Sequence, residues 1–290
     1  CNYHPEDVSF VVIDYKGGST AYALEELPHV CGIITDVGSG IDRCMQSLEY
    51  ELRRREDIFA SVGAKDIKEY IKGHHKGEFQ EAVPRLLIVF DEFKELIKER
   101  PVVKKMVDSI AAKGSSLGVH LILATQSPAD AVDEGTWNNT QYQICMKVQN
   151  AAASKVMIHE PDAAMITQAG RAYVRVGTSE KAETFALIQS AWSGAPYREN
   201  KEQGALEVRY VTMDGSRIKT VEENHTRFVS DKKEIEAVIA YIAKTAQAAG
   251  IEKQPSPWKT ELPDLFSWKK LPVEGSVSEG LEKLHIFQRQ

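Results

Sequence analysis

The chain has 290 residues, of which 42% are hydrophobic and 27% charged, and its formal net charge is -6 at pH 7. A chain of this length and apolar content can bury a sizeable core, so we expect one large domain with an appendage. The four cysteines form no CxxC pair, which argues against a zinc site or a disulfide framework and favours a reducing cytosol. No apolar run reaches the roughly 18 residues of a membrane span, so we expect any membrane attachment to lie outside this chain.

Short apolar segments rich in β-branched residues predict the strands of a buried sheet. The first of them, Val8 to Asp14, follows only seven residues, so we expect the chain to begin inside a domain. The other predicted strands are Gly32 to Val37, Leu86 to Phe90, Val119 to Thr125 and Gln143 to Val148.

Helical patterns separate these strands. Apolar residues at helical spacing predict a long amphipathic helix from Ile41 to Val62 that ends at Gly63. Its three consecutive arginines, Arg53 to Arg55, are expected on a solvated face. Shorter helices are predicted for Asp66 to Lys72, Glu92 to Lys98 and Val102 to Ala112. Helices that alternate with apolar strands indicate an α/β fold with a mainly parallel sheet.

The last third of the chain has a different pattern. Arg171 to Val176 and Ala182 to Gln189 predict a hairpin that adds an antiparallel edge to the sheet. We expect the core domain to cover residues 1–197 and residues 198–290 to form a linker region toward a following domain. Within the linker, Leu206 to Met213 predicts a strand and Asp231 to Ala249 predicts a helix with one apolar stripe.

The strongest candidate for chemistry is the apolar run Leu86 to Phe90, because two carboxylates, Asp91 and Glu92, follow it directly. Open α/β sheets bind ligands at the carboxyl ends of their strands. In P-loop ATPases the first carboxylate of such a pair holds the water shell of Mg²⁺, and the second polarises the attacking water. Asp91 and Glu92 are candidates for these two roles, although an Asp-Glu pair also stabilises an ordinary helix N-terminus.

Two neighbouring predicted strands also end in polar residues. Thr125 and Gln126 follow one of them and supply a hydroxyl and an amide that could contact a γ-phosphate or orient its water. The residues after the other strand include two glycines that permit a tight turn. They are Asp14, Lys16, Gly17 and Gly18. Because the three strand ends converge on one crevice, we expect them to border a site for ATP and Mg²⁺.

The chain contains no GxxxxGK[ST] phosphate loop. Its glycine-rich runs, Lys16 to Thr20 and Gly38 to Gly40, have the wrong spacing and no following Lys-Ser or Lys-Thr pair. The backbone amides and the lysine of such a loop supply most of the affinity for phosphate. We therefore expect this chain alone to bind nucleotide weakly or not at all.

Five motifs follow one another in the order VSFVVIDYKGG, LPHVCGIITD, RLLIVFDEFKEL, SLGVHLILATQSP and QSAWSGAPY. Together they resemble the first FtsK/SpoIIIE-type ATPase domain of the type VII secretion ATPases, the EssC/EccC family. The resemblance covers about Asn2 to Tyr197 and implies a RecA-like P-loop NTPase core. It also implies that the strand, phosphate loop and helix of the complete domain precede Cys1.

The resemblance further implies a membrane-anchored motor on the cytoplasmic face of the bacterial cell membrane, which exports small helical-hairpin proteins of the Trp-X-Gly class. Its partners would be other ATPase domains and neighbouring subunits, in a hexameric ring when complete. Asp91 and Glu92 match the magnesium and catalytic carboxylates of the family, and Gln126 matches its polar sensor. The chain departs from the family at Ala112 and Ser115, where related domains usually have arginines, one of them a candidate trans-acting finger.

Two other functions remain open at this stage. A double-stranded DNA translocase of the same superfamily is less favoured, because the net charge is acidic and the tail continues toward another domain. A non-catalytic regulatory module is suggested by Ala112, Ser115 and the absent phosphate loop. Lys113 could replace part of the lost charge, but a lysine lacks the bidentate fork of an arginine.

Overall fold

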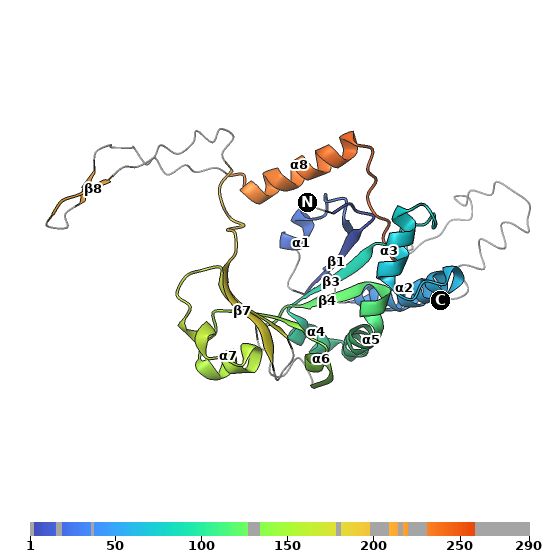
Figure 1. Cartoon of the computed structure of the whole chain (residues 1–290), viewed down its shortest axis with the longest axis horizontal. Helices are drawn as coiled ribbons and strands as arrows, with labels where there is room; N and C mark the ends of the chain where they lie inside the picture. The colour runs from blue at the N-terminus through green and yellow to red at the C-terminus, as the bar shows by residue number, and fades with distance from the viewer. Residues whose placement is uncertain are drawn as a thin grey trace, which may run out of the picture. The chain divides into compact units, whose positions relative to one another are not determined.

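The computed structural model describes residues 3–15, 19–35, 38–126, 134–177, 181–197, 209–213, 217–219 and 231–258. Its main sheet has four parallel strands in the order β2-β1-β3-β4 (Figure 1). These strands are β1 (Val8–Asp14), β2 (Val30–Ile34), β3 (Arg85–Asp91) and β4 (Val119–Leu123). Four of the five predicted strands are thus confirmed in the parallel sheet, with shifted ends. Strand β2 begins two residues early and ends at Ile34, β3 gains one residue at each end, and β4 ends two residues early, at Leu123.

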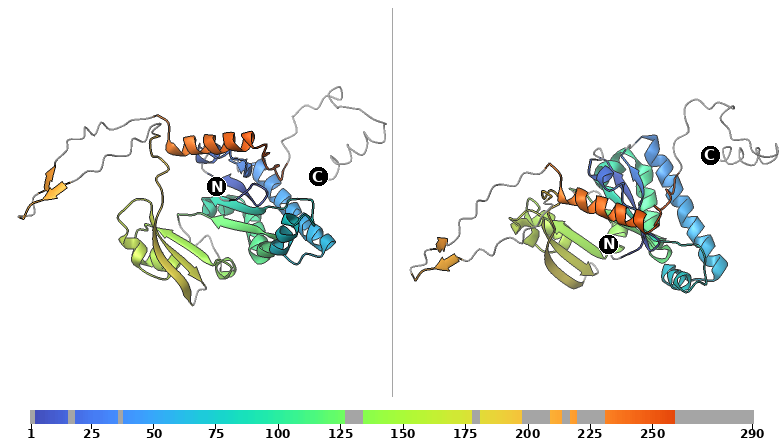
Figure 2. Two further views of the ribbon diagram at one scale, coloured as in Figure 1. Left: turned by 45° about the horizontal axis from the view of Figure 1, so that its top comes forward. Right: turned by 90° about the horizontal axis from the view of Figure 1, so that it is seen from above.

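Helices connect these strands on both faces of the sheet. They are α1 (Ser19–Ala23), α2 (Ser39–Val62), α3 (Ile67–His75), α4 (Phe93–Glu99) and α5 (Pro101–Leu117). The step from β1 to β2 runs in the opposite direction to the steps from β2 to β3 and from β3 to β4. Because parallel connections are right-handed, α1 lies on one face, and α2, α4 and α5 lie on the other (Figures 1 and 2).

Helix ends follow the expected local rules. Helix α2 ends at Gly63, as predicted, because this glycine adopts a left-handed conformation with φ of 71°. Helix α5 begins at Pro101, which needs no hydrogen-bonded N–H in the first turn, and it continues to Leu117, five residues past its predicted end at Ala112. Gly118 then ends the helix in the same left-handed conformation.

The arginine triplet of α2 is not a uniformly solvated face, so that expectation was wrong for one member. Arg53 is exposed, but the Arg55 side chain is only 2% exposed. Arg55 Nε donates to Glu51 Oε1 at 2.8 Å, and its Nη1 donates to the Leu117 carbonyl at 3.0 Å. Buried arginines occur when such partners compensate their charge, and here the partners join α2 to the end of α5.

A second, three-stranded sheet is antiparallel, with the order β5-β6-β7. It contains β5 (Tyr142–Met146), β6 (Arg171–Gly177) and β7 (Ala182–Gln189), preceded by α6 (Glu134–Asn138). The predicted hairpin of β6 and β7 is present. In the described residues, however, this hairpin pairs with β5 and not with the parallel sheet, which the sequence analysis did not foresee.

The side chains of β5 alternate between exposed and buried, as in a strand with only one covered face. Gln143 and Cys145 are buried, whereas Tyr142, Ile144 and Met146 are exposed. Alternation of this kind is typical of an antiparallel sheet with one covered face. Helix α7 (Ala151–Ile158) and the 3-10 helix η2 (Asp162–Met165) cover that face, and α7 is seen against it in Figure 2.

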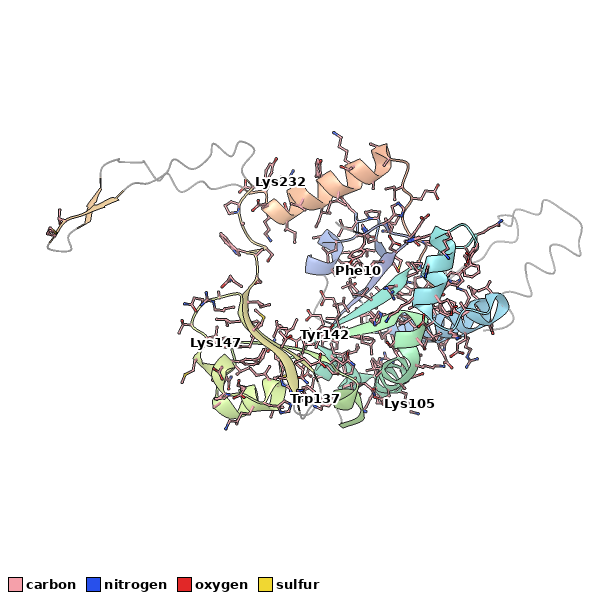
Figure 3. The ribbon with its side chains drawn as sticks, viewed as in Figure 1. Phe10, Lys105, Trp137, Tyr142, Lys147 and Lys232 are labelled. Atoms are coloured by element: carbon pink, nitrogen blue, oxygen red, sulfur yellow. The ribbon has the colours of Figure 1, made fainter. Side chains whose placement is uncertain are left out.

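The predicted C-terminal helix is present as α8 (Glu234–Ala248). Backbone hydrogen bonds from Tyr197 to Lys232 and from Glu234 to Ala195 join its start to the end of the core region, and Lys232 (labelled in Figure 3) also lies over the Tyr197 ring. Two short strands, β8 (Arg209–Val211) and β9 (Arg217–Lys219), pair between these points. No helix in the described ranges is both long and apolar enough to cross a membrane.

Candidate functional site

Two of the predicted site residues meet at the carboxyl ends of β1 and β3. These strands are in parallel register along their whole length, and the last register pair is Asp14 with Asp91. Asp14 is buried, whereas Asp91 is exposed at the edge of the sheet. Two neighbouring strands therefore present one carboxylate each at the same edge, where α/β sheets bind ligands.

Glu92 follows Asp91 in an unusual backbone conformation. Its φ and ψ are 54° and 46°, in the left-handed region that is unfavourable for a residue with a side chain. The turn bends the chain sharply from β3 into α4 and leaves the Glu92 side chain only 9% exposed. The Glu92 backbone N–H donates to Asp91 Oδ1 at 3.1 Å, which orients the Asp91 carboxylate against the turn. Strain of this kind gathers at functional sites.

The end of β4 is hydrogen-bonded to this turn. The Ala124 N–H donates to the Phe90 carbonyl at 2.8 Å, and the Phe93 N–H donates to the Ala124 carbonyl at 2.9 Å. Two residues further on, Gln126 Nε2 donates to Glu92 Oε1 at 2.5 Å. The structure therefore brings together the Asp91-Glu92 pair and the Gln126 amide, with Thr125 between Ala124 and Gln126.

Three of the predicted site residues lie outside the described residues. They are Lys16, Gly17 and Gly18, which follow Tyr15. The described candidates with a charged side chain at these strand ends are all carboxylates, namely Asp14, Asp91 and Glu92. Oxygen ligands of this kind suit Mg²⁺, which also keeps several waters and binds phosphate oxygens. In the described ranges no three His, Cys, Asp or Glu residues lie close enough to hold a metal ion by themselves.

Further polar contacts close to these strand ends were not singled out in the sequence. Tyr15, directly after Asp14, donates from its hydroxyl to Glu99 Oε1 at 2.5 Å, and this hydrogen bond to a carboxylate raises the pKa of the Tyr15 hydroxyl. Arg100 Nη1 lies 3.3 Å from Asp42 Oδ2 and joins the break between α4 and α5 to the first turn of α2. The position of Tyr15 next to Asp14 was the only signal that sequence reasoning could have used.

The two positions that depart from the family pattern lie on the exposed side of α5. Ala112 and Ser115 are both exposed, and neither has a charged side chain. Lys113, the possible substitute, is ion-paired within the chain, with its Nζ 3.1 Å from Glu56 Oε1.

Comparison with known proteins gives a consistent picture. Residues 1–130 match the FtsK/SpoIIIE family. The chain is 39% identical over 269 residues to the ESX secretion system protein EccC of Geobacillus thermodenitrificans, covering 90% of this chain and 18% of that protein. It is 38% identical over 275 residues to the type VII secretion system protein EssC of Staphylococcus aureus, covering 91% and 18%. This chain thus spans less than a fifth of the length of these relatives.

A solved structure supports the same relationship. The cytoplasmic domain of the type VII secretion ATPase EccC of Thermomonospora curvata superposes with a TM-score of 0.69 at 26% sequence identity. The match covers 90% of this chain and 26% of that chain. The similarity therefore extends well past residue 130, through the antiparallel sheet and into the C-terminal region.

Proposed function

Because residues 1–130 match the FtsK/SpoIIIE family, we propose that this chain is the first ATPase module of a longer type VII secretion motor. The motor hydrolyses ATP with Mg²⁺ and uses the energy to export small helical-hairpin proteins of the Trp-X-Gly class. The relatives named as type VII secretion proteins support this assignment. The observation that carries it is the meeting of Asp91, Glu92 and Gln126 at one sheet edge.

The roles of the site residues follow from their positions. Asp91 is exposed at the strand end, so it is the group that holds the water shell of Mg²⁺, and the metal offsets phosphate charge when bound. Glu92 accepts a hydrogen bond from the attacking water and so polarises the water. Gln126 lies against Glu92 and is the polar sensor. The remaining nucleotide-binding residues are Asp14, Lys16, Gly17, Gly18 and Thr125.

The phosphate loop of the module is supplied by a segment outside residues 1–290. The carboxylates at this edge repel a triphosphate unless a cationic loop offsets them, and the sequence contains no such loop.

The module acts on the cytoplasmic face of the bacterial membrane and is anchored through segments outside this chain. Its partners are the other ATPase domains of the same polypeptide and neighbouring subunits, in a hexameric ring when complete. Translocation of DNA is the less favoured activity, because the chain has an acidic net charge of -6. A regulatory module without turnover is the second candidate, and it is favoured by the exposed Ala112 and Ser115.

Export measured in cells tests the proposal. A strain whose complete motor carries Glu92→Gln should still make the motor and its small helical substrates but should no longer secrete them. Glu78→Gln, at an exposed carboxylate after α3, is the matched control and should leave secretion intact. Normal secretion by the Glu92→Gln strain would favour the regulatory module. Salt-dependent stimulation of the purified motor by double-stranded DNA would favour the translocase.

A further inference from the structure

The Gln126 amide contacts the carboxylate that the proposed function assigns to hydrolysis, and not only the space where a phosphate would lie. Gln126 Nε2 donates to Glu92 Oε1 at 2.5 Å. The Glu92 side chain is only 9% exposed, whereas its neighbour Asp91 is exposed. This hydrogen bond occupies one acceptor site of Glu92 Oε1 and holds the carboxylate toward the end of β4.

Backbone hydrogen bonds connect the same two segments. The Ala124 backbone is hydrogen-bonded to Phe90 and to Phe93, which lie before and after Glu92 in the chain. Glu92 itself is held in the left-handed conformation between those two points. The backbone of Ala124 and the side chain of Gln126 therefore both join the end of β4 to the strained turn. A displacement of Gln126 changes the surroundings of Glu92 directly.

We propose that Gln126 is a positioning residue that holds the Glu92 carboxylate turned inward and releases it when a γ-phosphate is present. A γ-phosphate brings several anionic oxygens, which are acceptors of the same charged kind as the Glu92 carboxylate, so it can compete with Glu92 for the Gln126 amide. Glu92 Oε1 then accepts a hydrogen bond from the attacking water. Hydrolysis is thereby tied to the presence of the third phosphate. The identity of the ligand as a γ-phosphate rests on the proposed function, whereas the restraint of Glu92 by Gln126 does not depend on it.

Chemical labelling of carboxylates in the complete motor tests the proposal. A carbodiimide with an amine nucleophile modifies accessible carboxyl groups, and mass spectrometry reports the extent at each residue. Without nucleotide, wild-type Glu92 should react slowly relative to Glu6, whose side chain is 56% exposed. Addition of ATPγS with Mg²⁺ should raise the labelling of Glu92 several-fold and leave Glu6 unchanged.

Gln126→Met removes the donor at similar side-chain size. In this variant Glu92 should react several-fold faster without nucleotide, and ATPγS should add little. KM for ATP should rise in this variant, because the γ-phosphate loses the Gln126 amide that it would otherwise take over from Glu92. Gln141→Met, at an exposed glutamine before β5, is the matched control and should behave as the wild type.

Equal labelling of Glu92 in the wild type and in Gln126→Met without nucleotide would overturn the inward hold. A fluorescent ATP analogue monitors binding separately. If the analogue binds but labelling of the wild type does not change with ATPγS, release by the phosphate is wrong. If the analogue does not bind to the complete motor, the proposed function fails. The labelling of Glu92 in the wild type and in Gln126→Met without nucleotide still tests whether Gln126 restrains Glu92.

Discussion

Replacement of Arg55 is expected to destabilise the protein more than replacement of any exposed arginine of α2. Arg55 is 2% exposed, and its guanidinium donates to Glu51 and to the carbonyl of Leu117 at the end of α5. Arg55→Ala removes both contacts, leaves the buried carbonyl without this donor and opens a cavity. Breaking a buried pair by removing one partner costs about 3–5 kcal/mol. Because Glu51 keeps its contact with Arg54, we expect about 3 kcal/mol.

Urea denaturation of the chain measures this difference, and Arg53→Ala is the matched control. Arg53 is 68% exposed and pairs with Glu49 one turn earlier. An exposed pair of this kind contributes about 0.3–0.5 kcal/mol. A free energy of unfolding for Arg55→Ala within about 1 kcal/mol of that for Arg53→Ala would refute the reasoning, because it would mean that the buried contacts add almost nothing.

The same pair gives a pH dependence. Burial alone would raise the pKa of the Glu51 carboxyl, but hydrogen bonds and charges from Arg54 and Arg55 lower it below its ordinary value of 4.5. A carboxyl with a lowered pKa in the folded state stabilises the protein above the pKa of the unfolded state, and this contribution is lost as the pH falls through the folded-state pKa. The difference in stability between the wild type and Arg55→Ala should therefore narrow as the pH falls below about 4.5.

Three further predictions concern other sites. Gly114→Ala should lower the free energy of unfolding by about 1–3 kcal/mol, because the new Cβ would lie 2.5 Å from the Val119 carbonyl oxygen. Gly40→Ala, where a Cβ would have no atom within 4 Å, should not destabilise the protein, and thermal unfolding compares the two variants. Glu92→Gly should have a free energy of unfolding equal to that of the wild type or up to about 1 kcal/mol higher, because glycine relieves the left-handed strain. A lower free energy of unfolding in urea would contradict this prediction. Burial, with the charges of Arg85 and Arg55, lowers the pKa of His120, so the midpoint of its NMR titration should lie below 6.5. Because the unfolded chain binds this proton more readily, the protein should lose stability as the pH falls below 6.5. A midpoint at or above 6.5 would be inconsistent with the structure.

Much of the parallel sheet could be predicted from the sequence because its strands read as continuous apolar runs, even though β4 is only partly buried. The same signal located Asp91 and Glu92, since a polar pair directly after such a run lies at the carboxyl end of the strand. The convergence of these strand ends was predicted from the parallel direction. The register of β1 with β3 shows it for Asp14 and Asp91, and the hydrogen bond to Glu92 shows it for Gln126.

Other features depend on tertiary contacts that no local pattern records. The pairing of β5 with β6 required knowledge of which face of β5 is covered, and its sequence YQICM does not distinguish a parallel from an antiparallel neighbour. The burial of Arg55 depends on the approach of α5, which is remote in the sequence. The left-handed conformation of Glu92 and its contact with Gln126 likewise follow from the turn between β3 and α4 and not from residue type.

Steady-state ATP turnover by the complete motor tests most directly the claim that Asp91, Glu92 and Gln126 form a hydrolytic centre. Glu92→Gln keeps the size of the side chain and an oxygen that accepts from Gln126, but it removes the charge that polarises water. The account predicts that this variant binds ATP with Mg²⁺ as the wild type does and loses turnover by about a hundredfold or more. Turnover within a few-fold of the wild type would contradict it.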